Sequence, residues 1–216
     1  MHTSLQSAWN HAAYNKEFTT PLQLDLLEKY IPKSARILDV GCGYGRSLHE
    51  LYCNGYLHLQ GIDFSEKMIE RSKKQYPYLS VDLQTSPDVS FEDYSFDAVI
   101  LFAVLTCIIE NEAQIHLLKE IKRVLKPDGI IYVNDFLLNT DQRNLDRYRS
   151  FKEKYPTYGV FELPDGLVLR HHSLEWVHTC LASFQALHFE ILSFPTMNGN
   201  KSNGYCFIGK NLSGIA

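Results

Sequence analysis

The 216-residue chain lacks several features that would set it apart from ordinary globular proteins. It has no apolar run close to the ~20 residues that a membrane span requires, and it shows no internal repeat or low-complexity segment. Its start, MHTS, does not open the basic and then apolar stretch of a secretory signal, so we expect none. With 45% hydrophobic and 21% charged residues, the composition predicts a single domain with a substantial core.

Strong charge and paired cysteines are also missing. The formal net charge of −4 gives no electrostatic reason to expect nucleic acid or an anionic membrane surface as a partner. The five cysteines include no Cys-x-x-Cys pair and stand apart at Cys42, Cys53, Cys107, Cys180 and Cys206. This pattern is typical of reduced thiols rather than of a disulfide framework or a zinc site. We therefore expect a cytoplasmic protein without a metal, present as a monomer or homodimer.

The most informative stretch is an apolar strand that ends in an acid and breaks into alternating glycines. It runs from Ile37 to Arg46 and reads ILDVGCGYGR. Glycine lets the backbone approach a ligand where a Cβ would collide, so a strand, a glycine turn and a helix can cradle a nucleotide-like ligand. An ordinary tight turn is the alternative. Asp39 before the glycines favours the cradle, and so does Asp63 after the next apolar strand, where a carboxylate can accept both hydroxyls of a ribose.

The glycine spacing distinguishes between two kinds of ligand. Dinucleotide folds use Gly-x-Gly-x-x-Gly and place a pyrophosphate at the helix N-terminus. Here the glycines are Gly41, Gly43 and Gly45, so the third comes one residue early. The carboxylate of Asp39 would also repel a pyrophosphate. An NAD-dependent oxidoreductase is therefore disfavoured, and a ligand with a positively charged end is favoured.

The motif DVGCGYG at residues 39–45, followed by GIDFS at 61–65, resembles the class I S-adenosylmethionine-dependent methyltransferases. The resemblance continues through FEDYSFDAVI at 91–100 and LKPDG at 125–129, and so covers roughly residues 35–136. It implies S-adenosylmethionine (SAM) as the cofactor and S-adenosylhomocysteine (SAH) as its product. SAM carries an ammonium, a sulfonium and a ribose but no phosphate, which suits the two acids.

The alternation of strand-like and helix-like runs, together with the resemblance, implies an α/β fold. We expect a Rossmann-like, doubly wound sheet of seven strands, mostly parallel with an antiparallel last strand and helices on both faces. The strand-like runs are 36–40, 58–63, 79–84, 96–102, 130–135, 189–194 and 205–209, and a Pro-Asp-Gly turn predicts a further hairpin over 161–169. Helices are expected at 5–15, from a Thr20 cap to Tyr30, from Asn111, and from a Ser173 cap to Phe184.

We divide this single methyltransferase domain, residues 1–216, into four parts. Helices in residues 1–34 would close over the cofactor, residues 35–138 would bind it, and residues 173–216 would supply the last helix and closing strands. Residues 139–172 would be an insertion that acts as a substrate lid. Its polar stretch from Thr140 to Tyr155 is rich in arginine and lysine. A patch for an anionic substrate is one interpretation, and a solvated helix face is the favoured one.

The resemblance implies further cofactor contacts. Phe64 would pack on the adenine, and Met68 would pack there or in the core. Many family members carry an acid after the third strand that meets the adenine amino group. That place falls here on Thr85 or Ser86, so a hydroxyl or backbone group would replace it. The remaining candidates are Phe102 at the end of the fourth strand and two N-terminal aromatics, Trp9 and Tyr14.

Two adjacent histidines are candidates for a catalytic base. The unperturbed pKa of histidine lies near neutrality, which suits His171 or His172 to take a proton from a hydroxyl or amine. Neighbours in an extended segment point to opposite faces, so at most one should enter the pocket, and a structural pair is the alternative. In the same aromatic-rich region, Tyr158 and Trp176 are candidate substrate contacts.

We therefore predict methyl transfer from SAM to an O, N, S or C nucleophile of a small molecule. The sulfonium already activates the methyl group, and alignment alone can lower a barrier by roughly 7–11 kcal/mol, so no catalytic motif is obligatory. The alternatives are a methyltransferase that acts on protein or tRNA and a non-catalytic SAM-binding module. LFAV stands after the fourth strand in place of Asn-Pro-Pro-Tyr, which argues against the nucleic-acid amino-group methyltransferases.

Overall fold

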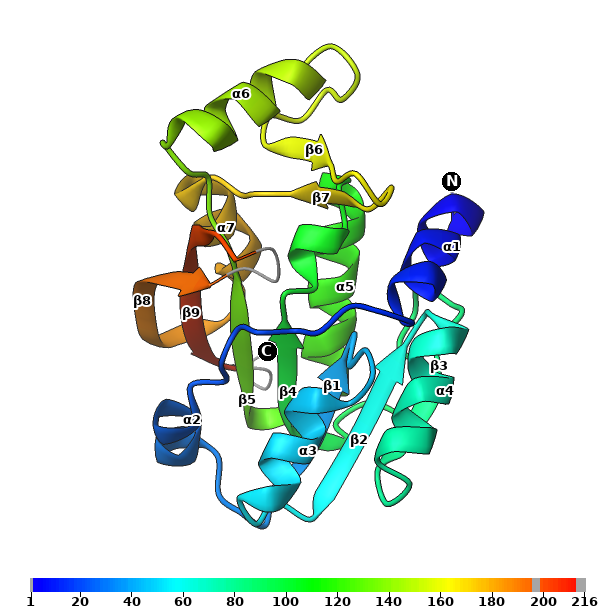
Figure 1. Cartoon of the computed structure of the whole chain (residues 1–216). Coiled ribbons are helices and arrows are strands. Elements are labelled where there is room, and N and C mark those ends of the chain that lie inside the picture. Colours follow the sequence, from blue (N-terminus) through cyan, green and yellow to red (C-terminus); the bar gives the residue numbers. More distant parts are fainter. Residues whose placement is uncertain (1, 196–198, 213–216) are drawn as a thin grey trace.

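The computed structural model describes residues 2–195 and 199–212, and at its centre lies one seven-stranded sheet (Figure 1). The strand order is β3-β2-β1-β4-β5-β9-β8. β1 to β5 run parallel, and β9 runs antiparallel between β5 and β8. The bounds are β1 Arg36–Val40, β2 His58–Asp63, β3 Ser80–Leu83, β4 Phe96–Phe102, β5 Leu125–Phe136, β8 Gln185–Pro195 and β9 Lys201–Lys210. The predicted doubly wound sheet with an antiparallel last strand is confirmed.

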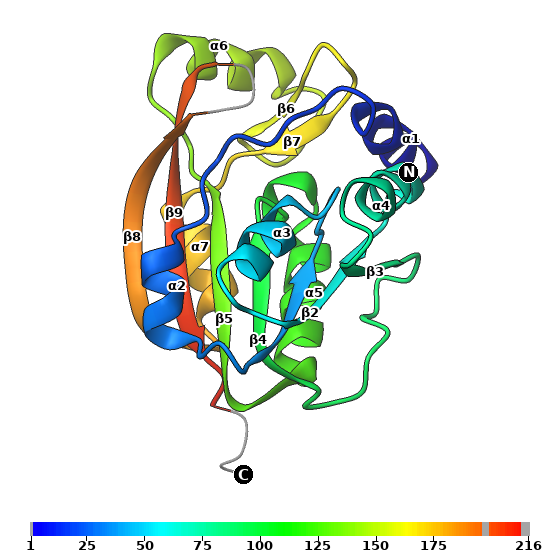
Figure 2. The same cartoon turned by 60° about the horizontal axis from the view of Figure 1, so that its bottom comes forward.

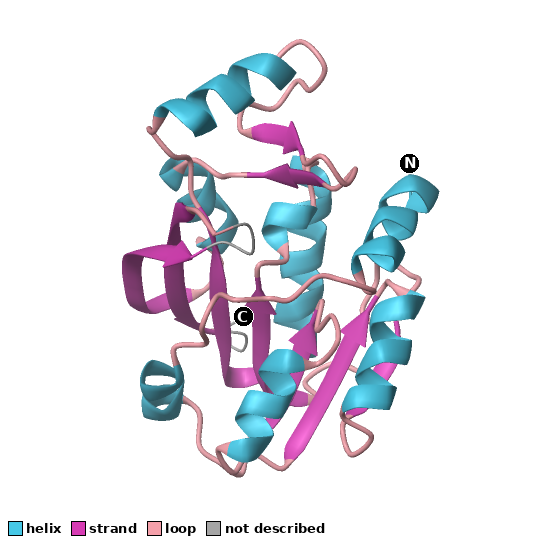
Figure 3. Ribbon diagram, viewed as in Figure 1, coloured by secondary structure: helices cyan, strands magenta, loops and turns pink. Residues whose placement is uncertain are grey.

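Helices cover both faces of this sheet, and each face has its own apolar core (Figure 3). α2 (Leu24–Tyr30) and α3 (Arg46–Cys53) pack on one face. α5 (Asn111–Val124) and α7 (Leu174–Leu181) pack on the other. Strands buried on both faces read as continuous apolar runs, which is why the central strands were visible in the sequence. α1 (His2–Ala12) lies against α4 (Glu66–Gln75) beside the sheet.

Residues 139–172, here called the lid segment, lie beyond the carboxyl ends of β4 and β5 (Figure 1). The segment contains α6 (Gln142–Phe151) and a separate hairpin of β6 (Val160–Glu162) and β7 (Val168–Arg170). The predicted Pro-Asp-Gly hairpin is thus confirmed. A third apolar cluster joins the lid segment to α1 and α4 through Trp9, Ala12, Met68, Tyr148, Phe161 and Leu163.

The connection from α1 to α2, residues 13–23, is here called the N-terminal segment. It runs across the sheet at the carboxyl ends of the strands (Figure 2). The predicted Thr20 cap of α2 is wrong because Arg46 Nη2 donates a hydrogen bond to the Thr20 carbonyl at 2.8 Å, which keeps this stretch extended. α2 therefore starts only at Leu24. Ser173 does cap α7, since its Oγ accepts a hydrogen bond from the backbone N–H of Trp176.

Three strands are longer than the sequence predicted. β5 begins at Leu125 rather than residue 130, because its pairing with β4 jumps from Leu125 to Ile130 and the intervening Pro-Asp-Gly bulges outward. Asp128 takes a positive φ of 63° in that bulge. Between the last two predicted strands a loop was expected over 196–203, but β8 and β9 extend each other as a long hairpin, so Lys201–Asn203 lie in β9. Residues 196–198 of that loop lie outside the described residues.

Candidate active site

A cavity of about 650 Å³ lies at the carboxyl ends of β1, β2 and β4, between the N-terminal segment and the lid segment. Open α/β sheets bind ligands at this edge. Most of the cofactor contacts predicted from the sequence line the cavity, namely Trp9, Asp39, Gly41, Gly43, Asp63, Phe64, Met68, Thr85, Ser86 and Phe102. His171 lines it as well. The chain therefore gathers these side chains at one place, although their roles stay predictions.

The glycine turn brings bare backbone to the cavity wall. Gly41 and Gly43 have φ values of +73° and +54°, which side chains rarely allow. A Cβ added at Gly41 would lie 2.7 Å from the Val104 side chain, and one added at Gly43 would lie 2.8 Å from the Phe18 ring. Gly45 does not line the cavity, so its predicted cofactor contact is corrected. It precedes α3 with φ +84°, and a Cβ there would come 2.6 Å from Ser72 Oγ, so it permits close packing on α4.

The two acids predicted at the cofactor site are both buried but differ in their partners. Asp39 is 1% exposed, and neither carboxylate oxygen has a hydrogen-bond partner among the described residues. Burial raises its pKa to about 8, although the guanidinium of Arg46 opposes the shift. Asp63 accepts hydrogen bonds from the backbone N–H groups of Gly43 and Ser65, both at 2.8 Å, and burial raises its pKa to about 6.

These environments decide what each acid can offer a ligand. A buried carboxylate without a partner is costly, so the site of Asp39 suits a cation. The Asp63 carboxylate fastens the glycine turn to the end of β2, and each of its oxygens keeps a lone pair for another donor. The arrangement fits a ligand with an ammonium and neighbouring hydroxyls, as SAM has.

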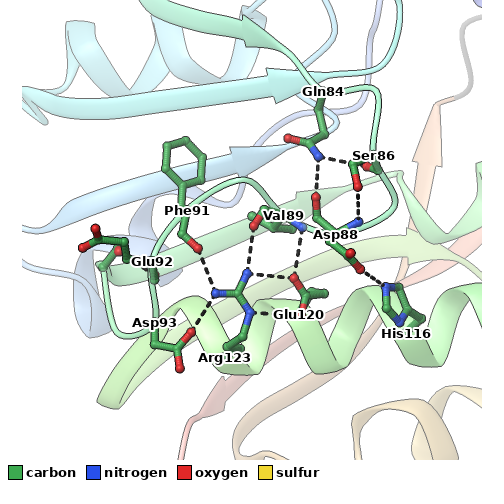
Figure 4. Close-up of polar contacts among 11 residues, drawn as sticks. Gln84, Ser86, Asp88, Val89, Phe91, Glu92, Asp93, His116, Glu120 and Arg123 are labelled. Carbon is green, nitrogen blue, oxygen red and sulfur yellow. Dashed lines mark hydrogen bonds and ion pairs between the residues drawn. The ribbon is translucent and has the colours of Figure 1, made fainter.

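The loop that carries Thr85 and Ser86 is anchored to α5 by one arginine (Figure 4). The Arg123 guanidinium donates to the carbonyl oxygens of Val89 and Phe91, each at 2.8 Å, and forms ion pairs with Asp93 and Glu120. Glu120 in turn accepts from the Val89 N–H, and His116 is 2.8 Å from Asp88 (Figure 4). These contacts could not be predicted from the sequence, because an acid and an arginine three residues apart are usual on a solvated helix.

The hydrogen-bond network assigns the proton positions of His171. Its Nδ1 lies 2.7 Å from the Tyr148 hydroxyl and 3.3 Å from Asn139 Nδ2. That hydroxyl accepts from the Asn139 backbone N–H, and among the described residues no acceptor other than His171 is within reach of its own hydrogen, which we therefore assign to His171. Asn139 is oriented by Leu137 and Asn203, and its Nδ2 is a donor. Nδ1 is therefore the acceptor, and the ring proton sits on Nε2.

Burial, reinforced by the positive charge of Arg147, lowers the pKa of His171 to about 3. The ring is therefore neutral at pH 7. Its Nε2–H has no partner among the described residues, and the residue lines the cavity. His171 thus offers the cavity a hydrogen-bond donor. This geometry argues against the predicted role as a base, because the only basic nitrogen is occupied inside the protein.

His172 faces the core, and the prediction that it is a base is corrected. Its Nδ1–H donates to the Phe136 carbonyl at 3.2 Å, and its Nε2 accepts from Gln114 Nε2 at 2.9 Å. It does not line the cavity. Burial also lowers the pKa of His172 to about 3. Both nitrogens are used in joining the lid segment to β5 and α5, so His172 is structural.

Three predicted aromatic contacts also lie away from the cavity lining. Trp176 packs on the α5–α7 core, and its Nε1–H donates to Gln114 Oε1 at 2.8 Å. Tyr158 is 55% exposed, and its ring packs edge-on against Tyr148 from outside. Tyr14, beyond the end of α1, is 69% exposed. The sequence shows that a segment is aromatic, but only packing decides which ring faces inward.

Several cavity residues were missed or misjudged in the sequence. Arg143 and Arg147 line the cavity, although a solvated helix face was expected for α6. Ala103 also lines it with a strained φ of +57°. Beneath it, buried Asp135 accepts a hydrogen bond from the Thr106 N–H at 3.2 Å and so holds η1 (Leu105–Cys107) to β5.

Among the described residues, no helix is long and apolar enough to cross a membrane.

Comparisons with known proteins agree with this geometry. Residues 38–133 match the family described as a methyltransferase domain. A ubiquinone/menaquinone biosynthesis C-methyltransferase of Geotalea daltonii is 32% identical over 145 residues, which are 63% of this chain and 57% of that protein. A ribosomal protein L11 methyltransferase of Dictyoglomus turgidum is 28% identical over 151 residues, 66% of this chain and 48% of that protein. The chain thus spans about half the length of the curated relatives it matches.

A solved structure extends the match to most of the chain. A SAM-dependent methyltransferase of Methanosarcina mazei aligns with a TM-score of 0.81 at 25% identity, over 87% of this chain and 97% of that one. The fold, the glycine turn and these matches define a class I methyltransferase domain. Residues 38–133 thus match a methyltransferase domain, and most of the chain has the fold of the SAM-dependent methyltransferases, whose cofactor is SAM.

Proposed function

We propose that the chain transfers the methyl group of SAM to an O, N, S or C nucleophile of a small molecule. One observation carries the proposal: the carboxylate of Asp39 is buried without a partner beside a glycine turn at the cavity wall. Asp39 would take the ammonium of the cofactor, and Asp63 would accept its ribose hydroxyls. When bound, SAM supplies a methyl group that its sulfonium already activates.

The remaining lining residues can be assigned to the rest of the cofactor. Phe64 and Met68 would hold the adenine faces, and Thr85 or Ser86 would meet its edge. Phe102 and Trp9 would complete the wall. Trp9 Nε1 is buried without a partner among the described residues, so it has a hydrogen-bond donor left for a ligand.

A small acceptor is supported by the form of the cavity. Its volume of about 650 Å³ lies in the range of small-molecule sites, roughly 300–1,000 Å³. Apolar side chains such as Phe136, Phe161 and Leu169 wall the lid end. The names of the relatives include both a C-methyltransferase of quinone biosynthesis and a ribosomal protein methyltransferase, so the cavity rather than the relatives supports this choice. The cytoplasmic location, the absence of nucleic acid and the monomeric or dimeric state stay predictions.

The chain's own contribution would be alignment and the exclusion of water. The lid segment and the N-terminal segment flank the cavity, and neither histidine of the lid segment is available as a base at neutral pH. Closing over two reactants holds them in line and removes competing water. An acceptor that needs no strong protein base fits this site.

Calorimetry tests the proposal directly. The purified chain should bind SAM and SAH, and NADH far more weakly. A screen of small acceptors by mass spectrometry should then find one that gains a methyl group. Tight NADH binding with no response to SAH would overturn the proposal. Tight SAH binding without transfer to any small molecule, protein or tRNA would favour a non-catalytic module.

A further inference from the structure

The lid end of the cavity holds two arginines of α6, and one of them forms no ion pair with a described carboxylate. Arg143 and Arg147 lie one turn apart on α6, and both line the cavity. Arg143 Nε is 3.6 Å from Asp141, and its Nη2 donates to the Lys201 carbonyl. Arg147 forms no ion pair with any described carboxylate, and its hydrogen bond goes to the amide oxygen of Asn144 at 3.3 Å.

The surroundings of Arg147 make this charge unfavourable as it stands. Burial lowers its pKa, and the neighbouring positive charge of Arg143 lowers it further, while Tyr148 and Asp141 oppose the shift less strongly. The guanidinium lies 4.3 Å from the centre of the buried Phe161 ring, and this cation–π contact offsets part of the cost without pairing the guanidinium with a carboxylate. An anion at this place would relieve both the desolvation and the repulsion.

A second hydrogen-bond donor stands beside it. The centre of the His171 ring lies 4.9 Å from the centre of the Phe161 ring, which also contacts Arg147. The Nε2–H of His171 has no partner among the described residues. The acids that line the cavity stand elsewhere: Asp39 and Asp63 at the strand ends, and Glu110 before α5. The lid end therefore presents donors and apolar rings.

We propose that the methyl acceptor is an organic acid whose carboxylate is held by Arg147 and the Nε2–H of His171. This inference rests on the proposed function and specifies its substrate class. The planar guanidinium matches a carboxylate in a two-pronged contact. Because Asp141 partly balances Arg143, the net charge suits a monoanion rather than a phosphate dianion. Phe136 and Phe161 would flank an apolar body attached to the carboxylate.

The test uses the full chain saturated with SAH and matched pairs of ligands. Each pair is an aryl or alkyl carboxylate and its primary amide, which have nearly the same shape but differ in charge. Calorimetry should show the carboxylate bound about 10–100-fold more tightly than the amide. Arg147→Gln should abolish this preference. Arg149→Gln removes the same charge from an exposed position of α6 and should keep it, and SAH affinity should be equal in all three proteins.

Three outcomes would overturn the inference. The first is equal affinity for carboxylates and amides in the wild-type chain. The second is a preference that survives Arg147→Gln or disappears equally with Arg149→Gln. The third is tighter binding of phosphate monoesters than of the matching carboxylates. A wild-type chain that fails to bind SAH would instead refute the proposed function, and this result is obtained before any acid is added.

Discussion

The two ends of the cavity are built in opposite ways. The strand end carries carboxylates and positive-φ glycines on β1, β2 and the turn between β1 and α3. The lid end carries a guanidinium and an imidazole N–H on a helix and a hairpin. The first is fixed by the backbone of adjacent parallel strands, whereas the second depends on which way side chains point. The difference suggests that the cofactor end tolerates little change and that the acceptor end is the adaptable one.

The largest effect should come from the glycine turn. Gly43→Val adds a branched side chain where even a Cβ would be 2.8 Å from Phe18, so SAH binding should be lost. Gly55→Val is the matched control, because Gly55 has φ +87° but nothing within 4 Å of an added Cβ. Calorimetry should find near-normal SAH affinity for the control, and normal affinity for Gly43→Val would move the cofactor elsewhere.

Asp63→Ala should come next. Hydrogen bonds to a charged group contribute roughly 1.5–3 kcal/mol, so SAH should bind about 10–100-fold more weakly. Asp82→Ala, one strand away and exposed, should leave the affinity unchanged. Thermal unfolding must accompany the measurement, because Asp63 also holds the N–H groups of Gly43 and Ser65. An unchanged dissociation constant in a folded variant would exclude Asp63 from the ribose.

The strand end should also respond to pH through Asp39. Its pKa of about 8 leaves the free carboxyl mostly protonated at pH 7, and an ammonium favours the ionised form. SAH binding should therefore release close to one proton at pH 7, and affinity should fall up to about tenfold per pH unit below pH 8. Calorimetry in buffers of different ionisation enthalpy measures this release. Asp39→Asn should abolish it, and proton release that persists in that variant would assign it to another group.

The same carboxyl should affect stability without ligand. The folded pKa of Asp39 lies above its ordinary value of 3.8, so its contribution is full below pH 4 and is lost as pH rises towards 8. Asp63, with its pKa raised to about 6, adds to this trend over the lower part of the range. Thermal unfolding should show Asp39→Asn losing less stability than wild type between pH 5 and 8. If the melting temperatures of wild type and Asp39→Asn changed equally with pH, the raised pKa of Asp39 would be contradicted.

The lid end should give the smallest effects. His171→Phe removes a neutral donor, which contributes roughly 0.5–1.5 kcal/mol, so the acceptor KM should rise about two- to tenfold with SAH affinity unchanged. His172→Phe should lower the melting temperature instead, because Gln114 loses an acceptor. With the pKa of His171 at about 3, turnover should show no imidazole titration between pH 5 and 8. Such a titration would restore the base hypothesis.

The sequence predicted the sheet and most cofactor residues because both depend on contiguous patterns. β1, β2 and β4 begin and end at the predicted residues, since buried parallel strands read as apolar runs. The lid end was less predictable. Helical spacing places Arg143 and Arg147 on one face, but a polar helix can turn that face to solvent or to a cavity. The orientation is decided by packing: Tyr148 of α6 is buried, and its hydroxyl lies 2.7 Å from Nδ1 of His171, which is 23 residues further along the chain.

One ion pair joins the two segments that flank the cavity. Lys16 Nζ of the N-terminal segment lies 2.5 Å from Asp165 at the hairpin tip of the lid segment. Arg71 on α4 donates to the carbonyl oxygens of Ala13 and Lys16 and so fixes the same stretch. The ion pair thus links the N-terminal segment to the lid segment. We therefore expect the two segments to move together, so that a single opening of the cavity admits or releases both cofactor and acceptor.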